Sequence, residues 1–167
     1  YEPFDPLLER SVMLTTAILG ASLGDALPDD AETVLAAAGA DLARINQVPV
    51  TGFGWIARDN PLPTRLTAPF ATWDAFATDL TAQPLDAWFE PGMLDRLETL
   101  ARIAPINPNH AVLAHGDVHT SHIFALNGHY AGIIDFGEIR GAEPLFDLGH
   151  VALHLPDALR SILQRYA

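Results

Sequence analysis

The sequence predicts an α+β fold in which amphipathic helices surround a single β-hairpin. Apolar residues recur at helical spacing in several separate segments, as expected for helices that cover a core. The dipeptide Asn127-Gly128 separates two short β-rich segments and is the strongest two-residue signal for a hairpin. Apolar residues make up 49% of the 167-residue chain, which is enough for the core of one domain.

One strand and one long helix are predicted in the first fifty residues. Ser11–Ile18 is β-branched and apolar and is bounded by glycines, which predicts a strand that leads into a turn. Asp29 or Asp30 can cap a helix that continues to about Gln47. The apolar positions that should face the core are Val34, Leu35, Ala38, Leu42 and Ile45.

The middle of the chain is predicted to contain a loop and two short helices. Residues 50–69 are rich in Gly, Pro and Thr and predict an irregular loop. Thr72 caps the first helix, and the second spans about residues 92–103. The expected inward faces are Trp73, Phe76, Ala77 and Leu80 in the first helix and Leu94, Leu97, Leu100 and Ala101 in the second. We interpret the three tryptophans as core residues: Trp55, Trp73 and Trp88.

The last third of the chain carries the hairpin. Residues 111–115 predict a short strand, 122–126 and 129–135 predict the hairpin, and Pro144 opens a helix to about residue 154. Asp157 caps a final helix. In a hairpin with a two-residue turn, Leu126 faces His129, so His122 lies within about two positions of Asp135.

Charge and composition exclude several classes of protein. The chain has nine basic residues, all of them Arg, against 21 acidic residues, and its formal net charge of −12 argues against non-specific nucleic-acid binding. No apolar stretch approaches the ~18 residues that a membrane span needs, so no membrane association is predicted. Cysteine is absent, which rules out disulfides and thiolate metal sites. No signal-peptide pattern follows Tyr1, and we expect a cytoplasmic protein.

Two acids and one histidine predict a metal and phosphate site at the base of the hairpin. An Asp135 oxygen suits Mg²⁺, whereas the imidazole of His122 would tolerate Mn²⁺ or Zn²⁺ better. Asp117 follows Gly116 in a loop, where a carboxylate can orient a hydroxyl and accept its proton. Asp147, near the start of the next helix, is predicted to accept hydrogen bonds from backbone N–H groups of that loop.

Histidine spacing also raises a rival, a zinc hydrolase. His115, His119 and His122 could form a mononuclear site, and His115 and His119 have the i, i+4 spacing of zinc hydrolases. Two histidines at i, i+4 can share a zinc ion only on a helix, and Gly116 together with the β-rich segments around it argues against a helix here. His150 and His154 share the spacing on a predicted helix without an evident third ligand, so we expect a partly exposed helix face there.

Three sequence blocks resemble one known group of enzymes. HGDVHTSH at 115–122, IIDFGE at 133–138 and EPLFDLG at 143–149 are similar to the phosphotransferases of the aminoglycoside and choline kinase group, which share the protein-kinase fold. Two earlier blocks, at 20–23 and 41–55, occur in that group's order. The resemblance implies a large C-terminal lobe, with residues 1–24 as hinge strand and turn. Residues 25–110 would form a helical core with a substrate-facing insertion, and 111–147 the catalytic and metal-binding loops.

The resemblance also implies roles for individual residues. Asp117 would be the catalytic base and Asp135 the metal-ligating acid, while His122 replaces the usual asparagine ligand, as in macrolide-type members. The implied adenine-contacting residues are Thr16, Ile18, Phe124 and Ile134, and the implied supporting residues are His115 and Asp147. The implied cofactors are Mg²⁺, with Mn²⁺ as an alternative, and ATP or GTP as co-substrate. The acceptor would be a hydroxyl of an aminoglycoside, macrolide, amino alcohol or sugar, and the acidity of the chain favours a cationic one.

One departure from the resemblance concerns the small lobe. That lobe supplies a glycine-rich phosphate loop and a lysine that pairs with a glutamate, but this chain contains no lysine. We therefore expect a large-lobe fragment whose missing partner is the N-terminal lobe, and which is inactive alone. A non-catalytic kinase-like binding module is the second interpretation.

Overall fold

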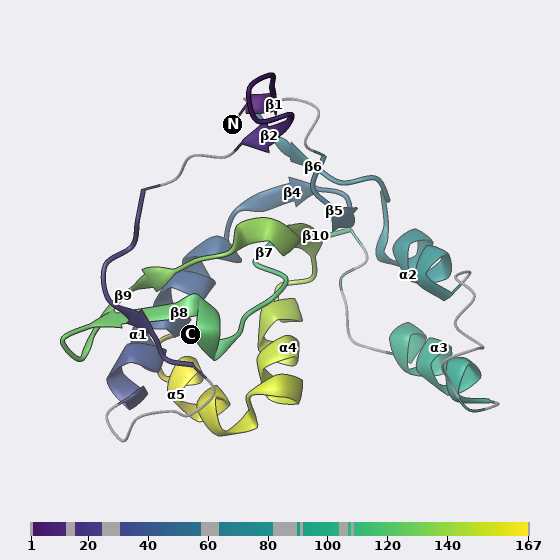
Figure 1. Ribbon diagram of the computed structural model, residues 1–167. Coiled ribbons are helices and arrows are strands. Elements are labelled where there is room, and N and C mark those ends of the chain that lie inside the picture. The colour runs from purple at the N-terminus through teal and green to yellow at the C-terminus, as the bar shows by residue number, and fades with distance from the viewer. Residues whose placement is uncertain are drawn as a thin grey trace.

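The computed structural model describes residues 2–12, 16–24, 31–57, 64–81, 90, 92–103, 107 and 109–166. The predicted α+β class is confirmed, because helices and three small sheets share these residues. Figure 1 shows a larger body in which the hairpin lies over helix α1 (Ala31–Ile45), with helices α4 (Phe146–His154) and α5 (Pro156–Tyr166) beside them. A smaller pair of helices lies to one side of it. None of the helices that the structure describes has the length and apolar character of a membrane span.

The larger body is held together by a core that three helices and the hairpin share. The long helix predicted in the first fifty residues is confirmed as α1, although its proposed caps Asp29 and Asp30 lie outside the described residues. Helix α5 begins at Pro156, so Asp157 occupies its first turn and the prediction that this residue caps the helix is wrong. The fully buried core residues include Ala38, Leu42, Val118, Ile123, Val151 and Ile162.

The predicted hairpin is present, and it is joined by a third strand. Strands β8 (Ile123–Leu126) and β9 (His129–Ile133) pair antiparallel with Leu126 opposite His129, as predicted. Asn127 and Gly128 have φ values of 52° and 76°, which is the left-handed pair that a type I′ turn requires. Strand β3 (Ala21–Ser22) pairs with β8 on the other side. The hairpin strands are shorter than predicted, because His122 ends a 3₁₀ turn, η2 (Thr120–His122), and β9 stops before Asp135.

A second sheet was not predicted. Its order is β5-β10-β7-β4-β6 among the described residues, and three of its strands fall in the expected loop at 50–69, so that prediction is wrong. Strands of two or three residues are too short to show an alternating pattern, and their partners are distant in the sequence: β4 pairs with β7, β6 with β4, and β5 with β10. The strands are β4 (Pro49–Thr51), β5 (Gly54–Trp55), β6 (Leu66–Thr67), β7 (Ala111–Ala114) and β10 (Arg140–Ala142).

The N-terminal segment differs from its prediction. Strands β1 (Glu2–Asp5) and β2 (Arg10–Val12) form their own antiparallel pair. The strand predicted over Ser11–Ile18 is therefore right only at its start, since residues 16–19 have no regular structure and 13–15 lie outside the described residues.

The two short helices are present, but one of them faces solvent. Helix α2 (Trp73–Thr81) is capped as predicted, because Thr72 Oγ1 accepts a hydrogen bond from the Ala75 N–H at 3.3 Å. Helix α3 (Met93–Ile103) was expected to turn Leu97 and Leu100 inward, yet they are 42% and 59% exposed. Helical spacing groups residues on one face without saying what covers that face.

The tryptophans and the remaining inward positions have mixed outcomes. Trp73 packs edge-to-face against Phe53 with ring centroids 6.0 Å apart, and Phe76 is buried beside it. Trp55 is 50% exposed, so its prediction as a core residue is wrong. Trp88 lies outside the described residues, as do the side chains of Leu80 and Ala101.

Two helical glycines provide a test of the packing between α1 and α5. A Cβ at Gly39 of α1 would collide with the backbone oxygen of Ile162 in α5, whereas a Cβ at Gly149 of α4 would meet nothing within 4 Å. Alanine is usually the better helix former by about 1 kcal/mol. We expect Gly39→Ala to destabilise the fold by about 1–3 kcal/mol because the helices must separate. Gly149→Ala should leave stability unchanged or raise it. Urea unfolding of both variants measures the contrast, and equal effects would contradict the close packing at Gly39.

Candidate active site

The loop that carries Asp117 is forced into place by a glycine. Gly116 has φ of 89°, and a Cβ there would collide with the carbonyl oxygen of Glu138. Only glycine combines this left-handed backbone with so close an approach. The loop after β7 is therefore pressed against the segment that follows Asp135.

Asp147 holds the same loop through hydrogen bonds from its backbone. Its Oδ2 accepts hydrogen bonds from the His115 N–H at 3.0 Å and from Asn46 Nδ2 at 2.8 Å, and its Oδ1 accepts from the Gly116 N–H at 2.9 Å. The side chain is fully buried. Three donors offset the cost of burying this carboxylate, and these include the backbone contacts predicted for Asp147. Its part in activity stays a prediction.

Asn46 and Tyr166 extend this buried network. The Tyr166 hydroxyl lies 2.7 Å from Asn46 Oδ1 and 2.7 Å from the carbonyl oxygen of Pro144, and its single proton is shared between these two acceptors. Burial, together with the negative charges of Asp147 and Glu143, raises the pKa of Tyr166 to about 12. The phenol therefore keeps its proton and its role as donor at neutral pH.

His115 joins the loop to the end of the hairpin. It is fully buried, its Nε2 donates to the Ile134 carbonyl oxygen at 2.9 Å, and its Nδ1 accepts from the Asp117 N–H at 3.3 Å. Its ring also packs against Phe136, with centroids 4.7 Å apart. Both ring nitrogens are thus engaged by the backbone, and this arrangement leaves neither for the zinc site considered above.

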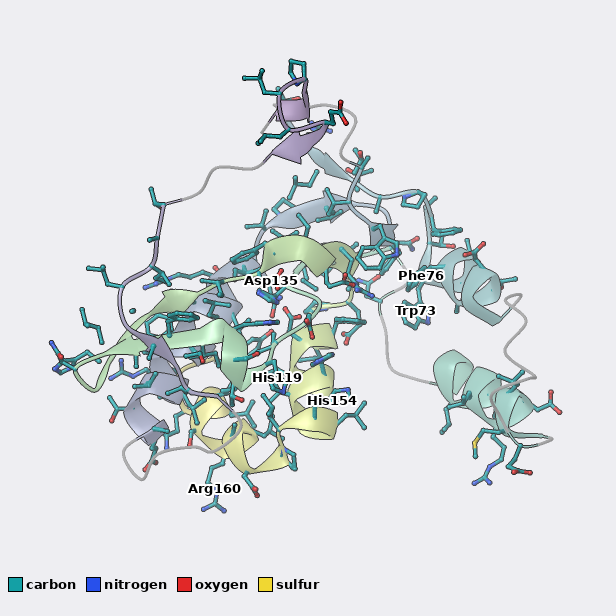
Figure 2. All side chains as sticks on the ribbon, in the orientation of Figure 1. Trp73, Phe76, His119, Asp135, His154 and Arg160 are labelled. Carbon is teal, nitrogen blue, oxygen red and sulfur yellow. The ribbon has the colours of Figure 1, made fainter. Side chains whose placement is uncertain are left out.

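His119 has a local structural contact. Its Nδ1 accepts from the Ser121 N–H at 3.2 Å and so caps the η2 turn. His119 is thereby held at the start of the turn that ends at His122. Figure 2 shows His119, Asp135 and His154 around the region where the hairpin faces α4.

His122 lies between the two aspartates. Its Nδ1 donates to the carbonyl oxygen of Asp117 at 2.9 Å and lies 3.8 Å from Asp117 Oδ2, while its Nε2 lies 3.6 Å from Asp135 Oδ2. The tautomer follows from the hydrogen bond to the carbonyl, which can only accept. With its proton on Nδ1, the ring would present the Nε2 lone pair toward the carboxylate of Asp135, and a cation held between them would offset the repulsion.

Asp135 has a strained backbone conformation. Its φ of 66° and ψ of 62° lie in the left-handed region, which costs a residue with a Cβ roughly 1–2 kcal/mol. The conformation lets Oδ1 accept from the Gly137 N–H at 3.3 Å, and the side chain is 59% exposed. The carboxylate is therefore presented to solvent beside His122.

His122 and Asp135 are two candidate ligands, which is too few for a metal site built from protein side chains alone but enough for a Mg²⁺ site that substrate completes. Among the described residues, no group of three His, Asp or Glu side chains is arranged to hold a metal ion. Mg²⁺ is commonly held by one or two carboxylates, with water and substrate phosphates completing its shell. His122 and Asp135 would supply the two protein ligands, and phosphate oxygens the others.

The predicted nucleotide-contacting residues are only partly brought together. The Ile18 side chain lies over Gly132 of β9, where a Cβ would collide with it, and Gly132 pairs with Phe124 of β8. The Ile134 N–H donates to the His122 carbonyl oxygen at 2.9 Å, so Ile134 continues the same strand pair. Thr16 is exposed two residues before Ile18. Ile18 and Phe124 thus flank the same point of the hairpin, and Thr16 precedes it.

A family model described as a phosphotransferase enzyme family matches residues 2–167. The chain belongs to this phosphotransferase family. Membership confirms the resemblance carried by the blocks at 115–122, 133–138 and 143–149. Among curated proteins, no sequence matches the chain.

Solved structures of family enzymes share the fold. A thermostable mutant of aminoglycoside phosphotransferase APH(4)-Ia, in its apo form, is 20% identical, with a TM-score of 0.61, and the match covers 90% of this chain and 52% of the other. Macrolide 2'-phosphotransferase MphH from Brachybacterium faecium is 16% identical, with a TM-score of 0.56 and coverage of 90% and 52%. Another mutant of APH(4)-Ia, in ternary complex with AMP-PNP and hygromycin B, is 20% identical, with a TM-score of 0.60 and coverage of 89% and 52%. The expected protein-kinase-like fold is confirmed, and the chain spans about half the length of these phosphotransferases.

Two residues around Asp117 and Asp147 were not predicted to contact them. His150 is partly exposed, as predicted, but its Nε2 also lies 3.6 Å from Asp117 Oδ1, which the sequence did not predict. Its position three residues after Asp147 on α4 could have suggested this, because residues i and i+3 share a helix face. Asn46 gave no signal, since 101 residues separate it from Asp147.

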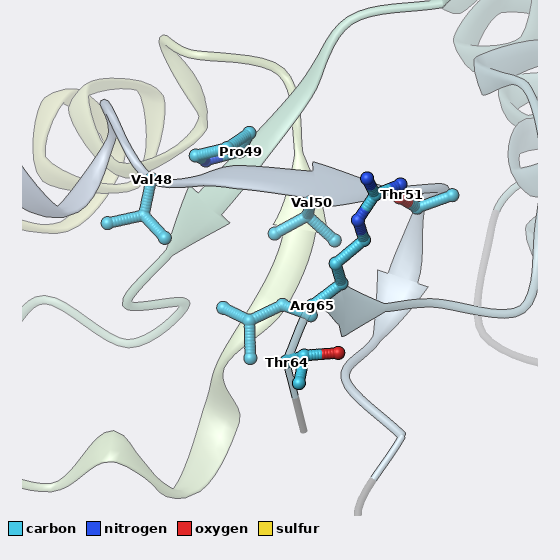
Figure 3. Close-up of a pocket in the computed structure, with 7 residues that line it drawn as sticks. Val48, Pro49, Val50, Thr51, Thr64 and Arg65 are labelled. Atoms are coloured by element: carbon cyan, nitrogen blue, oxygen red, sulfur yellow. The ribbon is translucent and has the colours of Figure 1, made fainter. Parts of the chain in front are cut away.

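One described cavity lies away from these residues. It has a volume of about 470 Å³ and lies beside the parallel pair of β4 and β6 (Figure 3). Its described lining contains none of the predicted site residues and consists of Val48, Pro49, Val50, Thr51, Thr64, Arg65 and Leu66.

Proposed function

We propose that the full-length protein is an ATP-dependent phosphotransferase that moves the γ-phosphoryl group to a hydroxyl of a small molecule. The observation that carries this proposal is the placement of His122 between Asp117 and Asp135, at 3.8 and 3.6 Å. One carboxylate is backed by a rigid loop and the other is presented to solvent beside a free imidazole nitrogen. Membership of the phosphotransferase family supports the same reading.

In this proposal Asp117 acts on the acceptor hydroxyl and Asp135 binds the metal ion. Asp117 Oδ2 orients the acceptor hydroxyl and accepts its proton as the hydroxyl oxygen attacks the γ-phosphorus. The bond from that phosphorus to the bridging oxygen breaks, and ADP leaves with the bridging oxygen. Asp135 and His122 would hold Mg²⁺, or Mn²⁺ in its place. When bound, the ion neutralises charge on the β- and γ-phosphate oxygens.

For the nucleotide and the acceptor, we propose classes of molecule and not single compounds. Ile18, Phe124 and Ile134 would contact the purine, with Thr16 at its edge, and ATP or GTP fits such a surface. The acceptor would be of the aminoglycoside, macrolide or choline type, and the net charge of −12 favours a cationic molecule. A structurally similar enzyme has been solved with AMP-PNP and hygromycin B, which supports testing those ligands first.

We also propose the division of the chain. Residues 1–24 would form the hinge, 25–110 the core with a substrate-facing insertion, and 111–147 the catalytic and metal-binding loops of the large lobe. A separate lobe would supply the lysine that is absent from these 167 residues. The 167-residue chain alone is then expected to be inactive.

Asp135 provides a direct test of the metal site. In the full-length protein, Asp135→Asn should weaken binding of Mg-ATP by at least about 10-fold, because the cation loses its carboxylate ligand. Binding of ATP in the presence of a chelator should be unchanged. Isothermal titration calorimetry measures both, and Asp95→Asn, at an exposed position on α3, is the matched control. Equal Mg-ATP affinity in Asp135→Asn and the parent would remove Asp135 from the metal site.

The second candidate function is a non-catalytic kinase-like binding module, which the absence of lysine favours. The module and the enzyme differ in turnover. Mg-ATP binding by the full-length protein without phosphorylation of hygromycin B, erythromycin or choline would support the module.

A further inference from the structure

The carboxylate of Asp117 lies between two imidazoles. His122 Nδ1 is 3.8 Å from Oδ2, and His150 Nε2 is 3.6 Å from Oδ1. The two rings are not equivalent, because His122 Nδ1 already donates its proton to the carbonyl oxygen of Asp117 at 2.9 Å. His150 Nε2 is therefore the imidazole nitrogen that lies nearer to a carboxylate oxygen of Asp117 and does not donate to the backbone of that residue.

The helix that holds the loop backbone also presents His150. Asp147 and His150 are three residues apart on α4 and so lie on neighbouring positions of one helix face. Asp147 accepts the N–H groups of His115 and Gly116, and His150 faces the side chain of the next residue, Asp117. One rigid element thus controls both the backbone and the side chain of the loop.

His150 is uncharged at neutral pH. Partial burial lowers the pKa of His150, and the neighbouring His154 lowers it further, with ring centroids 4.5 Å apart. Asp117 and Asp147 act in the opposite direction, and Arg140 of β10 lowers the pKa again. A neutral imidazole carries one N–H, and a carboxylate can only accept. The tautomer that satisfies Asp117 has its proton on Nε2.

We propose that His150 is a positioning residue for the catalytic base. Its Nε2–H is directed at Oδ1 of Asp117 and holds the carboxylate in one rotamer, which leaves Oδ2 for the proton of the acceptor hydroxyl. The inference rests on the proposed phosphotransfer function. The separation of 3.6 Å exceeds a hydrogen bond, and catalytic contacts of this kind tighten when substrates bind.

Two substitutions at one position separate positioning from packing. In the full-length protein, His150→Phe keeps a ring but loses the donor, and His150→Gln places an amide N–H near the position of Nε2. We expect His150→Phe to lower kcat on the order of 10-fold, with KM for Mg-ATP within about twofold, since one hydrogen bond to a charged group is lost. His150→Gln should restore most of kcat. His154→Phe, which keeps the ring stack one helical turn further on, is the matched control.

The acceptors to be tested are hygromycin B, erythromycin and choline with Mg-ATP, and Asp117→Asn is assayed beside the His150 variants. Loss of transfer in Asp117→Asn with wild-type kcat in His150→Phe would overturn the inference and leave the proposed function intact. Wild-type transfer by Asp117→Asn would overturn the proposed function itself.

A spectroscopic measurement tests the inference without turnover. Nitrogen-15 NMR of the imidazole rings reports which nitrogen of His150 carries the proton, and the His150→Gln spectrum identifies its signals. We expect the Nε2–H tautomer in the wild type and a loss of that preference in Asp117→Ala. A wild-type His150 with its proton on Nδ1, or a tautomer that is unchanged by Asp117→Ala, would overturn the proposal.

Discussion

Replacing Asp117 by asparagine is expected to lower kcat for phosphoryl transfer by about 10³-fold. An amide has nearly the shape of the carboxylate but cannot accept the proton that leaves the acceptor hydroxyl. The side chain is 42% exposed, and the contacts that hold this segment run through its backbone N–H and carbonyl groups. Stability and Mg-ATP binding should therefore stay close to those of the parent.

The measurement is steady-state transfer from Mg-ATP to an acceptor by the full-length protein, together with its thermal unfolding midpoint. Asp157→Asn, at an exposed position in the first turn of α5, is the control for loss of one negative charge. A loss of kcat below about threefold in Asp117→Asn would show that another group accepts the proton. An equal loss in the control would point to net charge instead of the base.

Features set by neighbouring residues could be predicted from the sequence. The turn at Asn127-Gly128 requires two left-handed residues, and this local requirement sets Leu126 opposite His129. A register shift between Phe124 and Ala125, which the sequence did not predict, then brings His122 one residue closer to Asp135. The helix at 31–45 was predicted for a similar reason, because its buried positions recur every three or four residues. Both features depend on chemistry within a few residues of one another.

Features set by distant partners could not be predicted. Strands β4 and β6 are too short to show a strand pattern in the sequence, and β4 forms because it pairs with β7. Leu97 and Leu100 were grouped correctly on one helix face, but the sequence does not show what covers that face. The contact between His150 and Asp117 likewise depends on how α4 crosses the loop, which is a property of the packed core.

The buried network around Asp147 depends on both local and distant residues, because it connects α1, α4, α5 and β7 to the loop that carries Asp117, the proposed base. Asn46 lies just beyond α1 and Tyr166 ends α5, and both reach Asp147 or its neighbours. The geometry of the exposed candidate site is thus maintained by buried residues behind it. Loss of the central carboxylate should disturb fold and site together.

Replacing Asp147 by alanine is expected to destabilise the fold by about 3–5 kcal/mol. The substitution leaves three buried N–H groups without their acceptor, namely those of His115 and Gly116 and one of the two on Asn46 Nδ2, whose other N–H still donates to the Leu113 carbonyl oxygen; it also opens a cavity around them. Asp147→Asn keeps the volume and one oxygen, so we expect an intermediate loss of about 1–3 kcal/mol. Urea unfolding at neutral pH measures both variants.

Asp79→Ala is the matched control for this substitution, because Asp79 is exposed on α2 and should change stability by no more than about 0.5 kcal/mol. The order of stability should be parent and control first, then Asp147→Asn, then Asp147→Ala. If Asp147→Ala unfolds with the control, the three donors find other partners, and the loop that presents Asp117 is not held by this carboxylate. If it unfolds as predicted, kcat of the folded fraction should also fall, since the base then loses its fixed position.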